Sequence, residues 1–243
     1  MSMQKLLSSM RRAINEYNMI ADGDRITVGL SGGKDSVALL AALAAYRRFS
    51  PEKFTLSAVT IDMGLGADFS PLEKLCQSLD VKFRIVKTDI GEIIFDIRKE
   101  KSPCSLCSKM RRGALNSAII EDGGGVLALG HHADDVAETF LLSLFYEGRL
   151  STFAPVSYMD RTGIRLIRPF VLTREKDIIP VSRSLPVVKN PCPRDHVTRR
   201  EYMRDMLKKL SGDIPNATDS LLTALFHPER NNLWDKAKRP EGV

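Results

Sequence analysis

The stretch Val28-Gly29-Leu30-Ser31-Gly32-Gly33-Lys34-Asp35-Ser36 decides how the rest of the chain is interpreted. An apolar run over residues 25–30 precedes two adjacent glycines, and an almost wholly apolar run over residues 37–45 follows them. This pattern predicts a strand, a tight loop and a buried helix. Adjacent glycines bring successive backbone N–H groups onto one point, so the loop is suited to binding phosphate. We call residues 31–36 the glycine loop.

The glycine loop is not a Walker A loop. That motif, Gly-x4-Gly-Lys-Ser/Thr, would need a glycine where Val28 stands and a hydroxyl side chain where Asp35 stands. The spacing Ser-Gly-Gly-x-Asp-Ser is different, and its serines, lysine and aspartate are more than an ordinary strand-to-helix turn needs. The loop therefore predicts phosphate binding of another kind.

Strands and helices alternate along most of the chain. Apolar runs predict strands over residues 25–30, 54–62, 81–88, 126–130 and 164–167. Helical patterns fall at residues 3–20, 37–46, 71–80, 90–97, 109–120 and 133–147, and later at residues 195–210 and 219–226. Another helix is expected to begin at Arg174 and to be kinked or ended by Pro180. This order predicts an α/β fold, a parallel sheet with helices on both faces, whose ligands lie at the carboxyl ends of the strands.

The composition indicates one main core with appendages. The chain has 243 residues, of which 43% are hydrophobic. We expect an N-terminal helix at 1–22, a nucleotide-binding domain at 23–185 and a C-terminal segment at 186–243. No apolar run approaches the roughly 18 residues of a membrane span, and the first residues lack a signal-peptide pattern. We therefore expect a cytoplasmic protein without a membrane partner.

The positive charge is uneven. The formal net charge is +6, and basic residues gather in two places: Lys109, Arg111 and Arg112, and then Arg194, Arg199, Arg200, Arg204, Lys208 and Lys209. Basic clusters beside a nucleotide site favour a polyanionic substrate such as RNA. A solvated helix face explains the second cluster equally well.

Three cysteines form a second group of candidate functional residues. Cys104 and Cys107 make a Cys-x2-Cys pair that can reach one metal centre, and Cys192, between two prolines, is the natural third ligand. An iron–sulfur cluster, a structural zinc site and a dithiol that forms a persulfide all remain open, with Cys76 or His196 as further zinc ligands. Cys76 falls on the apolar face of a helix and is expected in the core.

Four segments occur in one order on the chain: residues 31–36, Cys104-Ser-Leu-Cys107-Ser-Lys-Met-Arg-Arg-Gly113, Gly130-His-His-Ala-Asp-Asp135 and Arg174-Glu-Lys-Asp177. Together they resemble the tRNA 2-thiocytidine synthetases, a family of PP-loop ATP pyrophosphatases, over about residues 10–230, and the length of the chain is similar to that of the short branch of this family. The resemblance implies a Rossmann-like nucleotide hydrolase fold and a tRNA partner. It also implies that Cys104, Cys107 and Cys192 hold a [4Fe-4S] cluster.

The resemblance implies a two-step reaction. The carbonyl oxygen of a nucleobase, expected to be cytidine C2, attacks the α-phosphate of ATP, pyrophosphate leaves, and sulfur then displaces AMP. The sulfur donor, sulfide or a persulfide carrier, is not identified by the sequence, and a homodimer remains open. The chain is expected to be an ATP-dependent tRNA sulfurtransferase.

Roles in ATP binding follow for particular residues. The N–H groups of residues 32–36 and the hydroxyls of Ser31 and Ser36 are expected to hold pyrophosphate, and Lys34 to neutralise its charge. Two carboxylates in a phosphate pocket need a cation between them, so Asp35 and Asp135 are the Mg²⁺ candidates, with helix capping as the other explanation, above all for Asp134. Adenosine is expected against the backbone at Thr60, Asp62, Met63, Gly130 and His131.

Two other functions fit the same residues. One is an ATP pyrophosphatase that forms a C–N bond on a small molecule or a tRNA base, with structural zinc at the cysteines. The other is a zinc-stabilised RNA-binding protein without turnover. The Cys-x2-Cys pair favours sulfur transfer over the first, and the intact loop with both aspartates disfavours the second.

Overall fold

The computed structural model describes residues 2–98, 103–189, 191–192 and 199–233. A six-stranded sheet has the order β3-β2-β1-β4-β6-β5. Its strands are β1 (Arg25–Gly29), β2 (Thr55–Asp62), β3 (Lys82–Lys87), β4 (Val126–Ala128), β5 (Val156–Met159) and β6 (Ile164–Ile167). All neighbouring pairs are parallel except β5 with β6. The predicted parallel α/β sheet is confirmed.

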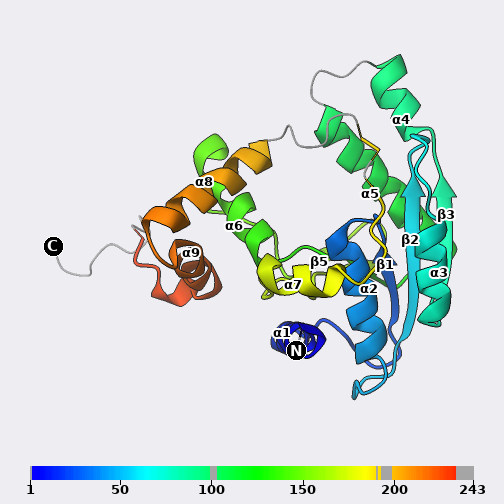
Figure 1. The fold of residues 1–243 in the computed structure, drawn as a ribbon, viewed down its shortest axis with the longest axis horizontal. Helices are drawn as coiled ribbons and strands as arrows, with labels where there is room; N and C mark the ends of the chain where they lie inside the picture. Colours follow the sequence, from blue (N-terminus) through cyan, green and yellow to red (C-terminus); the bar gives the residue numbers. More distant parts are fainter. Residues whose placement is uncertain (1, 99–102, 190, 193–198, 234–243) are drawn as a thin grey trace.

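The helices fall into two groups in Figure 1. Around the sheet lie α1 (Ser2–Glu16), α2 (Lys34–Tyr46), α3 (Ser70–Ser78), α4 (Ile90–Glu92) and its continuation η1 (Ile93–Ile97), α5 (Pro103–Glu121) and α7 (Glu175–Ser182). Away from strands β1 to β3 lie α6 (Ala133–Leu142) with its continuation η2 (Ser143–Glu147), α8 (Arg199–Asp213), α9 (Ala217–Phe226) and η3 (Pro228–Arg230). No described helix is long and apolar enough to cross a membrane.

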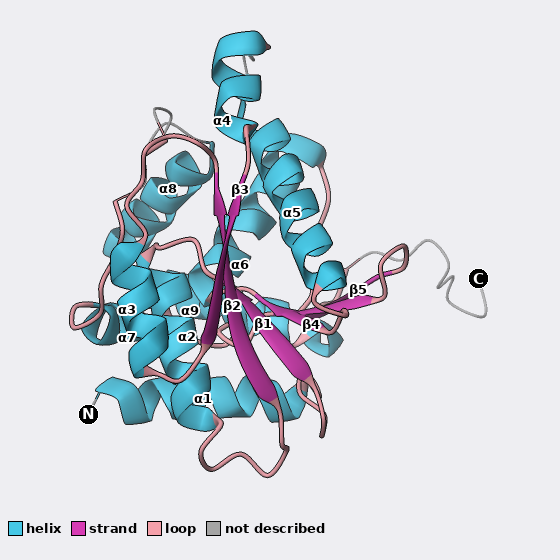
Figure 2. Ribbon diagram, turned by 90° about the vertical axis from the view of Figure 1, so that its right-hand side faces the viewer, coloured by secondary structure: helices cyan, strands magenta, loops and turns pink. Residues whose placement is uncertain are grey.

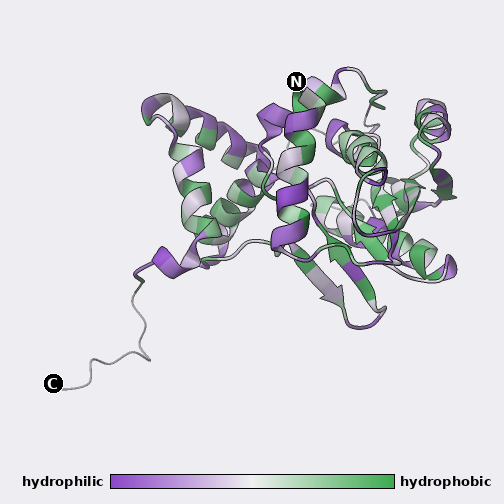
Figure 3. Ribbon diagram, turned by 90° about the horizontal axis from the view of Figure 1, so that it is seen from below, coloured by the Kyte–Doolittle hydropathy of each residue, from purple (hydrophilic) through white to green (hydrophobic). Residues whose placement is uncertain are grey.

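Helices cover both faces of the sheet, as the alternating pattern predicts. Figure 2 shows α2 and α5 on opposite sides of it. Val28 and Ala128 point into the main core beneath α2, whereas Leu127, between Val126 and Ala128, packs with Ile119 of α5 in a second cluster. This is the period-two alternation of a strand buried on both faces. In Figure 3 hydrophobic and hydrophilic residues alternate along the helices, as expected for helices that have one side in the core and the other side in solvent.

Helix α1 is built into the main core. Leu6 and Met10 are fully buried in the same cluster as Leu39 and Phe170. Leu207 of α8 belongs to that cluster as well. The division of the chain at residues 22 and 185 therefore stays a prediction, since one core joins all three segments.

Two expectations about the elements were wrong in ways that affect the site. Helix α5 already includes Pro103, whereas the sequence predicted a helix from residue 109. The cysteine pair therefore lies in a helix, not in a loop before it. The second expectation, strict alternation, fails at β5, which forms a hairpin with β6 around Gly163 in the left-handed region. Helix α7 ends at Ser182, two residues past Pro180, close to the predicted end.

Removing a core side chain of α1 tests whether this helix stabilises the whole domain. Met10→Ala is expected to lower the free energy of unfolding by about 2–5 kcal/mol, because a buried methionine leaves a cavity. Urea unfolding followed by circular dichroism measures it. Gln4→Ala, an exposed position on the same helix, is the control. A Met10→Ala protein as stable as the control would show that α1 is an independent appendage.

Candidate functional site

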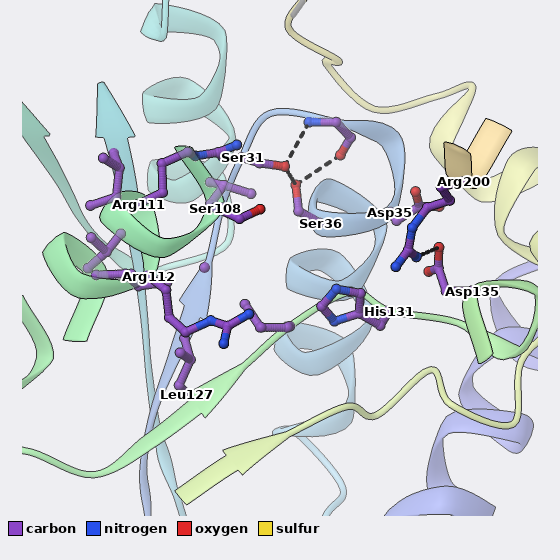
Figure 4. A pocket seen from close by; sticks show the side chains of 18 residues that line it. Ser31, Asp35, Ser36, Ser108, Arg111, Arg112, Leu127, His131, Asp135 and Arg200 are labelled. Carbon is purple, nitrogen blue, oxygen red and sulfur yellow. Dashed lines mark hydrogen bonds and ion pairs between the residues drawn. The ribbon is translucent and has the colours of Figure 1, made fainter. Parts of the chain in front are cut away.

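A cavity of about 400 Å³ opens at the carboxyl edge of β1, β2 and β4. The glycine loop forms one wall, α5 another, and the start of α6 with one residue of α8 closes the third, as Figure 4 shows. The polar side chains that line it are Ser31, Asp35, Ser36, Ser108, Arg111, Arg112, His131, Asp135 and Arg200. The cavity therefore lies at the predicted position, at the strand ends beside the glycine loop.

The glycine loop has the geometry of an anion site. Gly32 has φ +86°, which only glycine adopts without strain, and Gly33 caps α2 without a side chain. The first N–H groups of α2 are therefore open to a ligand. The Ser31 and Ser36 hydroxyl oxygens lie 3.1 Å apart, and the Ser36 hydroxyl donates to the Gly33 carbonyl at 2.9 Å. Both predicted hydroxyls thus stand at the mouth of the loop.

The two predicted magnesium ligands face the same buried histidine. The His132 Nε2 atom lies 3.8 Å from Asp35 Oδ1 and 3.6 Å from Asp135 Oδ2. His132 caps α6, and the Asp135 carboxylate accepts a hydrogen bond from the His132 N–H at 3.0 Å. Burial by itself raises the pKa of Asp135. The interaction with His132 and the hydrogen bond from its N–H lower the pKa by more, so the pKa of Asp135 lies below its usual value. Asp135 is therefore held ionised.

Mg²⁺ commonly takes only one or two carboxylates from a protein and completes its shell with phosphate and water. Asp35 and Asp135, which both line the cavity beside the glycine loop, fit this requirement. The predicted capping role of Asp134 takes a different form, because its carboxylate accepts the Glu175 N–H at the start of α7, at 2.6 Å, and pairs with Arg174 at 3.0 Å. Asp134 is thus a tie between helices α6 and α7.

Lys34 is paired with carboxylates. Its Nζ atom lies 2.8 Å from Asp35 and 2.8 Å from Glu175. Burial lowers the pKa of Lys34, but the hydrogen bonds to both carboxylates raise it to above the usual value. The sequence indicated Glu175 only as one residue of a motif, with no role of its own. Its contact with Lys34 shows that α7 helps to position the glycine loop.

Three arginines enter the cavity. The sequence indicated these arginines only as members of basic clusters. Arg111 and Arg112 reach it from α5, and Arg200 reaches it from α8 (Figure 4). The Arg200 Nη1 atom lies 3.3 Å from Asp135 Oδ1, and Nη2 donates to the Thr139 hydroxyl at 3.1 Å. Helix α8 therefore contributes a charge to the nucleotide cavity itself.

The residues predicted to touch adenosine fall in three different places. Gly130 and His131 line the cavity. Thr60 is buried, and its hydroxyl donates to the Leu30 carbonyl at 2.6 Å, so its side chain holds β2 to the residue that precedes the glycine loop. Asp62 and Met63 line a smaller adjoining cavity of about 40 Å³. Burial lowers the His131 pKa to about 4, which leaves a neutral ring.

The cysteines lie beside these cavities. Cys107 contacts Met63, with the two sulfur atoms 3.6 Å apart, and Arg111 one turn later on α5 lines both cavities. Burial raises the pKa of Cys107, Arg111 lowers it, and the nearby thiols of Cys192 and Cys104 raise it again, for a net increase. Cys107 thus lies beside the smaller cavity. Cys76 is fully buried in the core, as predicted, and burial raises its pKa to about 11.

Comparison with known proteins identifies the family of this chain. The model of the PP-loop domain matches residues 4–210. The tRNA-cytidine(32) 2-sulfurtransferase of Citrifermentans bemidjiense is 37% identical over 238 residues, which cover 96% of this chain and 93% of that protein. The enzyme of the same name from Aliivibrio fischeri is 38% identical over 242 residues, which cover 95% of this chain and 78% of that protein. The chain belongs to the PP-loop family. Within it, the chain belongs with the tRNA 2-thiocytidine synthetases, as the sequence motifs predict.

Solved structures show the same PP-loop fold. The U34-tRNA thiolase NcsA from Methanococcus maripaludis, solved with its [4Fe-4S] cluster, has a TM-score of 0.72 at 23% identity, covering 96% of this chain and 82% of that one. An NH3-dependent NAD synthetase from Campylobacter jejuni has a TM-score of 0.50 at 19% identity, covering 100% and 99%. At these identities the likeness concerns the fold alone.

Three cysteine thiolates suit an iron–sulfur cluster and also suit a zinc ion as a donor set. Among residues 2–98, 103–189, 191–192 and 199–233, no three His, Cys, Asp or Glu side chains are placed to hold a single metal ion. The group that the cysteines hold therefore stays a prediction. His196, a possible zinc ligand by sequence, lies outside the described residues.

The close approach of the end of β4 to the glycine loop can be tested with a single methyl group. A Cβ at Gly130 would lie 2.9 Å from the Asp35 carbonyl carbon and 3.1 Å from the Ser36 nitrogen. Because backbone atoms stand in the way, Gly130→Ala is expected to weaken ATP binding by about tenfold or more. Isothermal titration measures it, with Gly113→Ala, whose Cβ meets nothing within 4 Å, as control. Equal affinities for the two variants would contradict the geometry.

Breaking the ion pair between Arg204 and Glu138 tests whether α8 is merely a solvated basic helix. Glu138 is 1% exposed, and its carboxylate accepts the Arg204 Nε–H at 2.7 Å. Arg204→Ala removes this hydrogen-bonded pair and leaves the buried carboxylate with only the longer contact to Arg200 Nη1, at 3.9 Å, so the free energy of unfolding should fall by about 3 kcal/mol. Urea unfolding measures it.

The matched control is Lys208→Ala, one turn later on α8 and 71% exposed, with an expected change within about 0.5 kcal/mol. Because the loss in Arg204→Ala comes from a buried charge that has lost its hydrogen-bonded partner, adding Glu138→Gln should recover part of it. Equal stability of Arg204→Ala and Lys208→Ala would contradict the buried pair.

Proposed function

We propose that this chain is an ATP-dependent tRNA sulfurtransferase that adenylates a nucleobase carbonyl, with cytidine C2 as the target, and replaces its oxygen by sulfur. The observation that carries the proposal is the junction of two cavities. Ser31 of the glycine loop and Arg111 of α5 line both of them. The smaller cavity is also lined by Met63, which touches Cys107, and by Pro191, which precedes Cys192. A phosphate-binding loop thus adjoins the cysteines.

The first half-reaction needs a base oxygen, a phosphorus atom and a route for the leaving group. The open N–H groups at the start of α2 and the hydroxyls of Ser31 and Ser36 would hold the departing pyrophosphate. The base oxygen attacks the α-phosphorus, the bond to the bridging oxygen breaks, and pyrophosphate takes the electron pair. A magnesium ion at Asp35 and Asp135 would supply positive charge to the phosphates. Arg111 and Arg112 would add more charge from the opposite wall.

The second half-reaction needs a sulfur nucleophile within reach of the activated carbon. Cys104, Cys107 and Cys192 would hold the [4Fe-4S] cluster, and the cluster of the thiolase NcsA, which has the same fold, supports this assignment. Such a cluster, held by three thiolates, would supply an iron atom without a protein ligand, and this iron could carry sulfur to the substrate. Sulfur adds to the carbon, AMP leaves with the original base oxygen, and the thiocarbonyl remains. Sulfide would serve as the donor directly, whereas a persulfide carrier would need in addition a thiol that reduces the sulfur–sulfur bond and leaves as a disulfide.

A tRNA substrate is supported by the relatives and by charge. The two curated relatives named above act on tRNA cytidine by name. The formal net charge of +6 and the basic residues at the cavity wall favour a polyanion. A homodimer and a cytoplasmic location stay predictions.

The cysteine assignment can be tested separately from ATP activation. Anaerobically purified Cys192→Ala is expected to lose iron and tRNA thiolation, because a cluster held by three thiolates loses one of them. It should keep tRNA-dependent exchange of pyrophosphate into ATP. Iron and sulfide analysis, nucleoside mass spectrometry and the exchange assay measure the three properties.

Cys76→Ala is the matched control, since Cys76 is buried in the core, and it should keep iron. Wild-type protein that carries one zinc and no iron would contradict the sulfur-transfer mechanism. Release of ADP in place of AMP would contradict the assignment of the glycine loop.

A further inference from the structure

Exposed aromatic side chains gather where α6 and α8 pack together. Phe145 and Tyr146 belong to η2, at the end of α6, and are 60% and 49% exposed. Tyr202 of α8 is 64% exposed. Helices α6 and α8 are in contact and lie side by side in Figure 1. Large aromatic rings held together in water indicate a surface with a partner.

Arg199 joins the aromatic residues of the two helices. Its guanidinium lies over the Tyr146 ring, 4.6 Å from the ring centroid. Tyr202 follows Arg199 by three residues on α8, so the two side chains share one side of that helix. A cation stacked on an aromatic ring presents a flat surface with a positive charge. We call Phe145, Tyr146, Arg199 and Tyr202 the aromatic platform.

The two helices that carry the aromatic platform also supply residues to the cavity beside the glycine loop. Arg200, next to Arg199 on α8, lines the cavity and pairs with Asp135 of α6. Beyond η2 the chain passes through Gly148, in the left-handed conformation, and leads to Phe153. The Phe153 ring packs on His131 of the cavity, with 5.2 Å between ring centroids. The platform and the cavity are therefore joined through both helices.

The chemistry of the reaction indicates what would occupy this surface. A base whose carbonyl reacts inside a cavity must leave its stack, so its neighbours lose stacking partners. Proteins that bind unpaired nucleotides replace that stacking with aromatic rings and arginine planes. Exposed Arg149 adds positive charge beyond Tyr146. Exposed Glu147 lies between them in sequence, and the Ser143 hydroxyl donates to its carboxylate at 3.3 Å.

We propose that the aromatic platform binds the unpaired loop nucleotides that flank the modified base of tRNA, by stacking on Tyr146 and Tyr202 and by a phosphate contact from Arg199. The proposal rests on the proposed function and names the surface that delivers its substrate. It also gives Arg199 and Arg200 different tasks, one toward RNA and the other toward the nucleotide site.

Fluorescence anisotropy tests the proposal with two labelled RNAs, a tRNA transcript and a seven-nucleotide single strand of the anticodon loop. Tyr146→Ala and Tyr202→Ala are each expected to raise the Kd for both RNAs by about 5- to 100-fold, which is the usual range for losing one stacked base. Tyr146→Phe and Tyr202→Phe should bind within about twofold of wild type, because stacking needs the ring and not the hydroxyl. Arg199→Gln should lower the slope of log Kd against log salt by about one.

Tyr158→Ala is the matched control. Tyr158 is 71% exposed on β5 and pairs with Arg165 of β6, away from the strand ends that line the cavity. Its Kd should equal that of wild type. Affinities of Tyr146→Ala and Tyr202→Ala within twofold of this control would overturn the proposal, as would equal losses in the phenylalanine variants. If wild type binds the single strand through the platform but thiolates no tRNA, the proposed function fails and the platform stands.

Discussion

The site depends on one close backbone contact, between the end of β4 and the start of α2. The Gly130 α-carbon lies so near the Asp35 carbonyl and the Ser36 nitrogen that no side chain fits there. The contact puts the chain after β4 directly beside the glycine loop, and the capping box of His132 with Asp135 then fixes the second carboxylate. Asp35 and Asp135, which lie 100 residues apart in the chain, face one cavity for this reason.

Buried charges attach the C-terminal helices to that cavity. Arg204 pairs with the buried Glu138, and Arg200 pairs with Asp135. On the other side of α6, Arg174 pairs with Asp134. Part of the positive charge of α8 is therefore neutralised inside the protein, and its outer residues are the ones that can reach RNA. Because Arg199 and Arg200 are adjacent, a displacement of α8 by bound RNA would also move Arg200 relative to the proposed magnesium site.

The sequence predicted the sheet and the glycine loop well because both depend on local patterns. Apolar runs of strand length and the two glycines act over a few residues, and their positions agree with the structure to within a few residues. The beginning of α5 was wrong because a charged stretch before Pro103 was interpreted as a loop that included the cysteines. Strand β5 was missed because Pro155 and Gly163 indicated a loop, although they frame a four-residue strand.

Pairings between distant residues could not be predicted. Lys34 was expected to face pyrophosphate, and its contact with Glu175 depends on the packing of α7 against α2. On this basic helix, the position of Glu138 decides that Arg204 is half-buried and paired, since a buried carboxylate needs a partner. Such contacts follow from the tertiary structure, whereas the composition gives only the charge.

If a base oxygen attacks the α-phosphorus of ATP at the glycine loop, that oxygen leaves in AMP. A tRNA transcript whose cytidines carry oxygen-18 at C2 tests this reaction, with mass spectrometry of the AMP and pyrophosphate formed during thiolation. We expect one heavy oxygen in AMP for each thiocytidine and none in pyrophosphate. Heavy oxygen in pyrophosphate, or thiocytidine formed with unlabelled AMP, would contradict it.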